Sequence, residues 1–536
     1  MSFESNAKIF HRNRMGEFPP PQPDAVAVGI STKLKIFPQE VLGRGSMNTR
    51  VFKGLFEDEI PVAIKRVERD VFKGIDDQLV ESSSSEVKLL RKLNNENIVR
   101  YFIADSDAFS IYIALDLCDG CLVEFVETKT GFTFPKSLYA SDNTYKKVIL
   151  KQISCGLEYL HELSIIHGDL KPQNVLMKRT VAQEFEYRAV ISDFGLSLEI
   201  DSERSSATAH DELIGSDGWR AREVLIVLEK IKKAKQKQKN NNRSAEDNYC
   251  KLRGTKSVDI FAYGCIALYV MIRVKRERFF HPFGTAEVRN KNIMAGLREV
   301  YLSKNRKRKL DELFGDILIG TCISEDPSLR PTPREIIKHP FFWDADKRIP
   351  FLIKFFNHSL SNYNKKKNSA MIACLEERWE EFHGPDSFQY VPEAWNYVKT
   401  HDGKFSKNPS LEEPTAYNAL RMIRNIHSHY GQIFDERESK EHCRELVSSI
   451  PRNTNDCFAK YFLDSMVQIL PIVYLVLFES TEGGNSTYRD EYFDNTHDSD
   501  FQEQLDYEKK VAISSWMTLT VIKKDMTREN DVMDSR

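Results

Sequence analysis

Near the end of the chain, the segment RNIHSHY (Arg424–Tyr430) brings together residue types that could cleave RNA by internal transesterification. RNA carries its own nucleophile, so the protein must supply a base for the 2′-hydroxyl, a group that holds the phosphate and an acid for the leaving 5′-oxygen. Arg424 and Asn425 could hold the phosphate, and His429 could be the acid. We expect these residues to converge at one helix end or its following loop. This chemistry requires no metal ion or other cofactor.

The base for the 2′-hydroxyl has two candidates. Tyr417 carries a hydroxyl close to the cluster in sequence, and His427 is an additional imidazole within it. Taken alone, a cluster of this composition is more often a capping or surface arrangement. Its position after a second set of chemical motifs favours the catalytic interpretation.

The second set begins with HGDLKPQN (His167–Asn174) and is followed by SDFG. Asp169 could accept the proton of a substrate hydroxyl, and Lys171 could steady a transferred phosphoryl group. Asn174, together with Asp193 of SDFG, offers oxygen ligands for Mg²⁺. These motifs predict phosphoryl transfer from a nucleotide.

Upstream residues could bind the nucleotide. Gly43 and Gly45 in LGRGSMNTRVF would let the backbone approach phosphates, although Asn48 replaces a third glycine of the usual pattern. Lys65 in VAIK offers an ammonium to the α- and β-phosphates, and Glu86 is placed on a predicted helix where it could pair with that lysine.

In this order the motifs resemble the eukaryotic protein kinases, over roughly residues 34–343. The resemblance implies ATP and Mg²⁺ as cofactors, an ion pair between Glu223 and Arg330, and Asp259 as the anchor of the catalytic loop. The nucleotide-binding residues that it implies are Gly43, Gly45, Val51, Lys65, Glu86, Asp116 and Cys118.

One departure from the kinase pattern concerns regulation. Position 168 is glycine where most protein kinases have an arginine that binds a phosphorylated activation loop. Control of that loop must then use other cations, or phosphorylation matters less. The candidate autophosphorylation sites are Ser202, Ser205, Ser206 and Thr208.

The elements that must position these residues follow from composition and periodicity. The 536 residues, 41% hydrophobic and 29% charged, are ordinary for a soluble chain of two domains and a tail. A strand-rich region followed by helical patterns predicts a two-lobed α+β domain, and the helical periodicity continues after it. We expect a flexible leader (1–32), a bilobal kinase domain (33–343), an all-helical extension (344–479) and a disordered tail (480–536).

The extension begins directly after HPFFW (His339–Trp343), where protein kinase domains close. This join and the RN-x-x-x-H pattern resemble the kinase-extension nuclease of the unfolded-protein-response sensor kinase-endoribonucleases and of ribonuclease L. The resemblance implies a kinase and endoribonuclease in one chain, which acts on RNA as a homodimer or higher homo-oligomer. It assigns Arg424 and Asn425 to the scissile phosphate and His429 to the general acid. Leu411 and Asn418 depart from it, since family members have a tyrosine and an aspartate there.

Other classes of protein are disfavoured. The formal net charge of −2 excludes a globally cationic surface, and nine cysteines without repeated spacing indicate reduced thiols. The start has no signal-peptide pattern, and the apolar stretch Met466–Phe478 is too short to span a bilayer, so we expect a cytoplasmic protein and a buried helix. Two alternatives stay open: a nucleotide-gated scaffold without phosphotransfer, and a Ser/Thr kinase whose extension has lost RNA cleavage.

Overall fold

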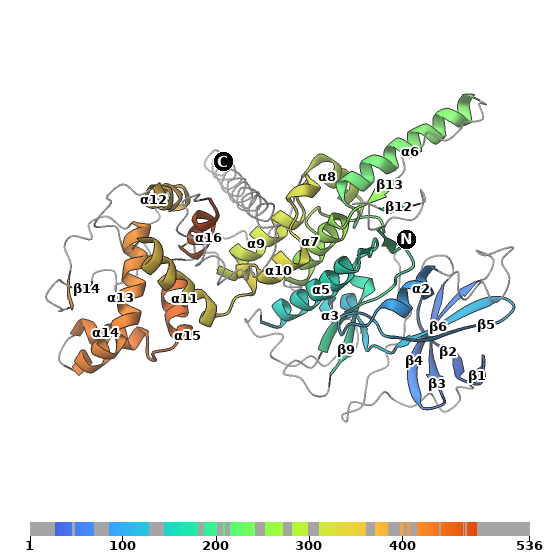
Figure 1. Cartoon of the computed structure of the whole chain (residues 1–536), viewed down its shortest axis with the longest axis horizontal. Helices are drawn as coiled ribbons and strands as arrows, with labels where there is room; N and C mark the ends of the chain where they lie inside the picture. The colour runs from blue at the N-terminus through green and yellow to red at the C-terminus, as the bar shows by residue number, and fades with distance from the viewer. Residues whose placement is uncertain are drawn as a thin grey trace, which may run out of the picture. The chain divides into compact units, whose positions relative to one another are not determined.

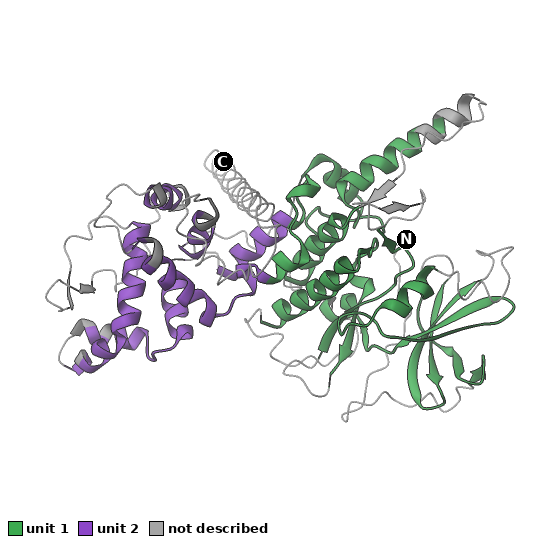
Figure 2. Ribbon diagram, in the orientation of Figure 1, with its two compact units in different colours: residues 1–300, 322–337 green, residues 301–321, 338–536 purple. Residues whose placement is uncertain are grey.

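The computed structural model of the chain describes most of the two predicted domains. The described residues are 27–44, 49–68, 85–127, 144–180, 187–200, 207–209, 215–241, 252–271, 281–297, 310–360, 370–383, 397–399, 405–407, 415–438, 441–464, 466 and 469–479. Figure 2 shows two compact units: residues 1–300 with 322–337 form unit 1, and residues 301–321 with 338–536 form unit 2. Gly45, Leu411, Ser202, Ser205, Ser206 and the tail from 480 lie outside the described residues.

Unit 1 begins with a six-stranded antiparallel sheet in the order β1-β2-β3-β4-β6-β5 (Figure 1). Its apolar face packs around Leu34, Val62, Ile64 and Ala114, which are all fully buried. These strands are rich in the β-branched and aromatic residues that suit a pleated, half-buried surface. The strands are β1 (Val28–Gly29), β2 (Leu34–Arg44), β3 (Arg50–Phe56), β4 (Ile60–Glu68), β5 (Tyr101–Ser106) and β6 (Ser110–Asp116). Strand β1 lies within the predicted leader, because a turn at residues 30–33 lets it pair with β2.

The register of this sheet aligns three of the predicted nucleotide-binding residues. Gly43 on β2 pairs with Val51 on β3, and Val51 pairs with Lys65 on β4. Directly opposed residues share one face of a sheet, so the three lie in a row across neighbouring strands. The sheet therefore gathers residues that are up to 22 positions apart in sequence, from Gly43 to Lys65.

The rest of unit 1 is mainly helical. Helix α5 (Thr144–Glu162) buries Ile149, Ile153 and Leu157, at the spacing that places side chains on one helix face. Helix α7 (Ser257–Met271) is buried over nearly all its length, which fits its apolar sequence. The other helices are α2 (Ser85–Lys92), α3 (Leu122–Glu127), α6 (Arg222–Asn241), α8 (Arg289–Ala295) and α10 (Pro333–Lys338).

Short strands lie between these helices in the chain and pair with one another. Strand β9 (Val175–Arg179) lies between β10 (Tyr187–Ile191) and β7 (Gly120–Cys121), and β8 (Ile165–Ile166) pairs with β11 (Leu198–Glu199). A further pair joins β12 (Ala207–Ala209) and β13 (Leu252–Gly254). The predicted α+β, bilobal fold is confirmed: a β-sheet lobe is followed by a helical lobe, with more helices after it.

Unit 2 is built mainly of helices, with one difference from the prediction. Strands β14 (Tyr397–Lys399) and β15 (Phe405–Lys407) form a short antiparallel pair, so the extension is not entirely helical. The helices are α9 (Leu310–Cys322), α11 (Ala345–Phe355), the π-helical turn η5 (Phe356–Leu360), α12 (Ala370–His383), α13 (Ala416–Asp435), α14 (Glu441–Ser449), α15 (Asn455–Phe458) and α16 (Ile469–Glu479).

Helix α16 confirms the interpretation of the most apolar stretch. Ile469, Ile472, Val473 and Val476 are fully buried, as a helix without a polar face requires. In the parts of the chain that the structure describes, no helix combines the length and apolar character needed to cross a membrane.

Candidate active sites

Lys65 is the centre of the first candidate site, in unit 1. Its ammonium on β4 lies 2.6 Å from Glu86 Oε1 of α2 and 2.7 Å from Asp193 Oδ1. Burial alone would lower the pKa of Lys65, but the carboxylates of Glu86 and Asp193 outweigh it and raise this pKa above its ordinary value. Burial would likewise raise the pKa of Asp193, and Lys65 holds it below its usual range instead. Lys65 and Asp193 therefore carry their charges at neutral pH.

Hydrogen bonds from Lys171 and Asn174 hold Asp169 in place. Its Oδ2 accepts a hydrogen bond from Lys171 Nζ at 2.7 Å, and Asn174 Nδ2 donates to its backbone oxygen at 2.8 Å. Lys171 also donates to Ser216 Oγ at 2.6 Å. The other carboxylate oxygen of Asp169, Oδ1, is buried and has no hydrogen-bond partner among the described residues. A buried acceptor without a partner is costly, and a bound hydroxyl would satisfy it.

Asp259 fixes the backbone before Asp169. Its carboxylate accepts from the backbone N–H groups of His167 and Gly168, each at 2.9 Å, and lies 3.0 Å from His161 Nε2. Burial would raise the pKa of Asp259, but these contacts, His161 first, lower it. Asp259 is thus a charged, fully buried carboxylate that anchors the backbone of His167 and Gly168, as predicted.

Gly168 explains one departure from the kinase pattern. Its φ is +78°, and a Cβ atom at this position would lie 2.8 Å from the backbone oxygen of Leu196. An L-residue rarely adopts this φ, and the backbone oxygen cannot move aside as a flexible side chain would. An arginine therefore does not fit at position 168 in this backbone conformation.

The segment from Gly215 to Glu223 is anchored by an ion pair that the sequence predicts. Arg330 donates from Nη1 and Nη2 to the two oxygens of Glu223, at 2.7 and 2.9 Å. It also donates to the backbone oxygens of Ser257 and Ser324. Four hydrogen bonds on one buried guanidinium make this contact rigid.

The residues expected to hold Mg²⁺ fit that ion. Asp193 and Asn174 supply a carboxylate and an amide, the hard oxygen donors that Mg²⁺ prefers, and Asp193 has a φ of +65°. Strained backbone of this kind occurs at functional sites. No group of three or more metal-binding side chains occurs among the described residues, as expected for an ion that takes further ligands from phosphates.

Two of the predicted nucleotide-binding residues, Asp116 and Cys118, lie at the end of β6 and just after it. Asp116 is its last residue, and its side chain pairs with Lys178 of β9. Cys118 follows two residues later, with its thiol 3.9 Å from the backbone oxygen of Asp116. The Asp116 carboxylate is thus paired, and the backbone N–H of Asp116 donates to the backbone oxygen of Arg100 at 2.9 Å. Nucleotide binding by this segment stays a prediction.

Arg424 is the centre of the second candidate site, in unit 2. Its Nη1 donates to Asn425 Oδ1 at 2.8 Å, and its Nε donates to Asn357 Oδ1 of the π-helical turn at 3.2 Å. Two neutral amide oxygens thus hold a guanidinium in place without cancelling its charge. Such a group remains suited to a phosphate.

The cluster lies close to the predicted helix end. Arg424, Asn425 and His429 all lie within α13, in which two helical segments meet. The helix is kinked at His429, where φ is −114° and ψ is 15°. Buried residues such as Ile423 and Ile426 keep the segment helical, because leaving the helix would expose them.

The two candidate bases have different surroundings. Tyr417 lies in the first turn of α13, with its ring centroid 5.5 Å from that of Phe356. Its backbone N–H donates to Glu376 of α12 at 2.9 Å. The His427 ring centroid lies 4.9 Å from that of Phe458, and burial lowers the pKa of His427. His427 is therefore neutral at pH 7 and is also a packing residue.

Comparison with known proteins identifies the first unit. The family model for the protein kinase domain matches residues 38–342, which is more than half of the chain. The chain belongs to the protein kinase family. Within that family it is similar to "Serine/threonine-protein kinase/endoribonuclease IRE2" of Homo sapiens, with 29% identity over 84% of this chain and 42% of the relative.

Two further relatives are similar to this chain over most of its length. "Serine/threonine-protein kinase/endoribonuclease ire-1" of Caenorhabditis elegans is 30% identical over 87% of this chain and 42% of its own length. "Sensor for unfolded proteins in the ER ire1" of Schizosaccharomyces pombe is 29% identical over 84% of this chain and 38% of its own length. The chain spans less than half the length of these curated relatives.

Sequence reasoning missed several residues of this kinase and its extension. Ser216 accepts a hydrogen bond from the catalytic-loop lysine, Lys171, and lies in the segment GSDGWRA (Gly215–Ala221). Asn357 and Glu376 hold Arg424 and the start of α13 from elements 40 or more positions upstream. No spacing or motif in the sequence signals these two contacts.

Proposed function

We propose that this chain is a bifunctional enzyme, a protein Ser/Thr kinase and a metal-independent endoribonuclease. ATP binding and autophosphorylation promote its assembly into a homodimer or higher homo-oligomer, which activates RNA cleavage. The observation that carries the proposal is the presence of two separately built sites: the Lys65 ion-pair cluster in unit 1 and the Arg424 cluster in unit 2.

The kinase half of the proposal follows from the charged groups around Lys65 and Asp169. Lys65 is positioned to bind the α- and β-phosphates, and Glu86 fixes its direction. Asn174 and Asp193 would hold Mg²⁺, which neutralises negative charge on the phosphates. Asp169 Oδ1 accepts the proton of the attacking hydroxyl, and Lys171 stabilises the transferred phosphoryl group.

The nuclease half follows from the Arg424 cluster. Arg424 and Asn425 bind the scissile phosphate and offset the charge that develops as the 2′-oxygen attacks. His429 gives a proton to the leaving 5′-oxygen, and either Tyr417 or His427 takes the proton of the 2′-hydroxyl. The products are a 2′,3′-cyclic phosphate and a free 5′-hydroxyl. The similarity to relatives that are named kinase/endoribonucleases supports both halves.

Two other functions have specific support. Gly168 and Asn48 favour a scaffold whose nucleotide pocket only gates assembly. Leucine at position 411 favours a kinase with an inactive extension. Cytoplasmic location remains a prediction from the sequence.

One experiment separates these functions. The purified chain, as wild type, Asp193→Ala and His429→Ala, is first incubated with radiolabelled ATP and Mg²⁺, and a stem-loop RNA is then added together with excess EDTA. We expect His429→Ala to lose RNA cleavage and keep phosphorylation. Wild-type protein that leaves RNA intact contradicts the nuclease half, and absence of incorporated phosphate supports the scaffold.

Assembly is tested by concentration. Specific RNA cleavage activity should rise steeply with protein concentration over the range where the oligomer forms. A flat specific activity would contradict the requirement for assembly.

A further inference from the structure

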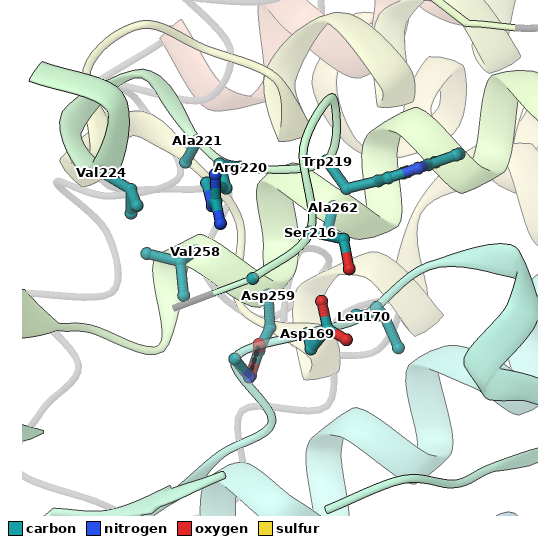
Figure 3. A pocket seen from close by; sticks show the side chains of 12 residues that line it. Asp169, Leu170, Ser216, Trp219, Arg220, Ala221, Val224, Val258, Asp259 and Ala262 are labelled. Carbon is teal, nitrogen blue, oxygen red and sulfur yellow. Dashed lines mark hydrogen bonds between the residues drawn. The ribbon is translucent and has the colours of Figure 1, made fainter. Parts of the chain in front are cut away.

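Helix α6 begins at an anchored position in unit 1. Figure 3 shows Val224, in the first turn of α6, lining a small pocket together with Asp169 and Arg220. Val224 is buried, and Glu223 makes the ion pair with Arg330. The beginning of α6 is therefore fixed to its domain.

The other end of α6 lacks this kind of packing. Among the side chains of the helix that the structure describes, that of Ile231 is the last buried one. From position 232 to 241 the sequence has no apolar residue larger than alanine. Figure 1 shows this end of the helix extending past the neighbouring helices of unit 1. Helices are usually held by an apolar face that packs on their domain, so this end serves some purpose other than packing.

This end of α6 is strongly basic. Residues 229–241 contain one glutamate and six lysines, at positions 230, 232, 233, 235, 237 and 239. The described lysine side chains, Lys230, Lys232 and Lys233, are exposed. Lys233 lies 3.4 Å from Glu229, and a pair of two exposed side chains contributes little to stability. At 3.6 residues per turn, the six positions are spread around the whole helix.

The lysines are placed where they repel one another. Lys233 and Lys237 are four positions apart, and so are Lys235 and Lys239. Residues at this spacing are neighbours on the helix surface, and like charges there destabilise the helix. Glutamine forms helices about as well as lysine without this repulsion, so helix formation alone does not require six lysines. A polyanion bound along the helix would remove the repulsion.

The composition of this end distinguishes between classes of polyanion. A helix that binds a membrane surface needs an apolar face beside its basic one, and residues 232–241 have none. A protein interface takes most of its affinity from aromatic and arginine side chains, which are absent from residues 229–241. The phosphate backbone of a nucleic acid requires only positive charge. RNA is the nucleic acid on which the proposed nuclease acts.

We propose that the segment Lys230–Lys239 of α6 binds the phosphate backbone of RNA and holds substrates on the chain. The segment is about 14 Å long, and a nucleic-acid duplex carries a negative charge about every 2 Å of its axis, so several phosphates lie within reach. Phosphate contacts carry no sequence information, and the segment has no aromatic ring on which a base could stack. This RNA contact is therefore independent of base sequence.

The inference goes beyond the proposed function, because it places an RNA-binding surface in unit 1. The Arg424 cluster, where the proposed cleavage occurs, belongs to unit 2. Binding along α6 does not require that cluster to be active. The two proposals can therefore be tested separately.

The test measures binding. Full-length His429→Ala protein is titrated into a fluorescent stem-loop RNA in EDTA, and anisotropy is recorded over a series of salt concentrations. Lys230→Gln, Lys232→Gln and Lys233→Gln are then combined in this protein. We expect the combined variant to bind RNA at least about tenfold more weakly at about 100 mM salt. The slope of log K against log salt concentration should become shallower by about 2.

Two further variants control for charge. Lys33→Gln, Lys35→Gln and Lys92→Gln remove the same number of charges from exposed lysines elsewhere in unit 1. Together they should change the affinity for RNA by less than about twofold, because exposed charges away from the bound RNA are screened by salt. Glu229→Gln is the reciprocal change, since it removes the one acidic residue of positions 229–241. It should tighten binding by about twofold.

Cleavage kinetics give a second measurement. In protein that keeps His429, the three substitutions in α6 should raise KM for RNA by about tenfold and leave kcat unchanged, because they remove binding that is equal in the ground state and the transition state. Peptide phosphorylation should also be unchanged.

The outcomes are distinguishable. Equal RNA affinity in wild type and the α6 variant, or an equal loss in the control variant, overturns the assignment of α6 and leaves the nuclease proposal standing. A chain that binds RNA through α6 but never cleaves it contradicts the nuclease half alone, and a chain that binds no RNA contradicts both. Vesicles of anionic lipid are the last arm. Vesicle binding that the α6 variant loses, with its RNA affinity unchanged, would assign α6 to a membrane surface instead.

Discussion

The two candidate sites are assembled in opposite ways. In unit 1, Lys65, Glu86, Asp169 and Asp193 come from separate strands, helices and loops, and ion pairs hold most of them together. In unit 2, Arg424, Asn425 and His429 lie on one helix, and amide oxygens hold the arginine. The proposed kinase site therefore depends on the fold of a whole domain, whereas the proposed nuclease site depends on one helix and the turn beside it.

This difference predicts which substitutions should cost each site the most. Removing one member of a buried ion-pair network leaves another charge without its partner, which is costly. Removing an amide that holds an arginine costs about one hydrogen bond. The expected effects of substitution below run from the largest to the smallest.

The largest effect is expected at Asp169. Asp169→Asn should lower phosphate incorporation by about a thousandfold, because an amide cannot take the proton of the attacking hydroxyl. The measurement is initial-rate incorporation from labelled ATP at saturating peptide. Nucleotide binding should persist, and a variant with more than a tenth of wild-type activity would contradict the role of Asp169.

The corresponding substitution in unit 2 should have the next largest effect. His429→Ala should lower RNA cleavage by about a hundredfold, since the leaving oxygen then departs without a proton. A substrate with a sulfur leaving group needs no such proton, so it should restore most of the rate. Failure of that substrate to rescue cleavage would argue that His429 only shapes the kink in α13.

Asp259 tests how much stability the kinase site draws from a buried charge. Asp259→Asn should lower the free energy of unfolding by about 3 kcal/mol at pH 7, because His161 and the catalytic-loop N–H groups lose their shared acceptor. The pKa of Asp259 is lowered by folding, so its contribution is present above the unfolded value of about 3.9 and is lost as pH falls through the folded value.

Urea unfolding at a series of pH values measures this contribution. The gap between wild type and Asp259→Asn should narrow as the pH falls below that unfolded value. Asp217→Asn, a change at an exposed carboxylate, is the control and should alter stability by less than about 0.5 kcal/mol. A gap that widens in acid would contradict the assigned charge.

Asn357 should have a moderate effect on the nuclease. Asn357→Ala should lower RNA cleavage by about tenfold, since Arg424 loses one of its two amide acceptors. Asn357→Asp restores an acceptor but adds a charge that competes with the phosphate, so it should raise KM more than it lowers kcat. Unchanged kinetics in both variants would remove Asn357 from the site.

The smallest effect is expected at His427. His427→Gln should lower RNA cleavage by less than about threefold at saturating RNA, because the ring serves mainly to pack on Phe458. Tyr417→Phe is the paired variant and should have the larger effect. The reverse order would assign the base to His427.

Much of the kinase site could be predicted from the sequence, because its motifs occur in a fixed order and each carries one chemical task. Lys65 and Glu86 were placed as partners from a strand and a helix, and the structure brings them together. The Glu223–Arg330 pair was predicted in the same way and is present. The helical extension predicted for residues 344–479 already placed Arg424 in a helix, and α13 bears this out. The kink at His429 was not predicted, because a polar cluster within an amphipathic pattern does not reveal where a helix bends.

The sequence by itself determined which chemical groups this protein has and in what order they occur. The kinase motifs, the RN-x-x-x-H pattern and the glycine at position 168 are all local, so no folding is needed to see them. Only the tertiary structure decided that Gly168 has a backbone conformation in which arginine does not fit, that Asn357 holds Arg424, and that Arg220 shares a pocket with Asp169. The physical reason is that these contacts join segments far apart in the chain, and hydrogen bonds over such distances leave no periodic signal in the sequence.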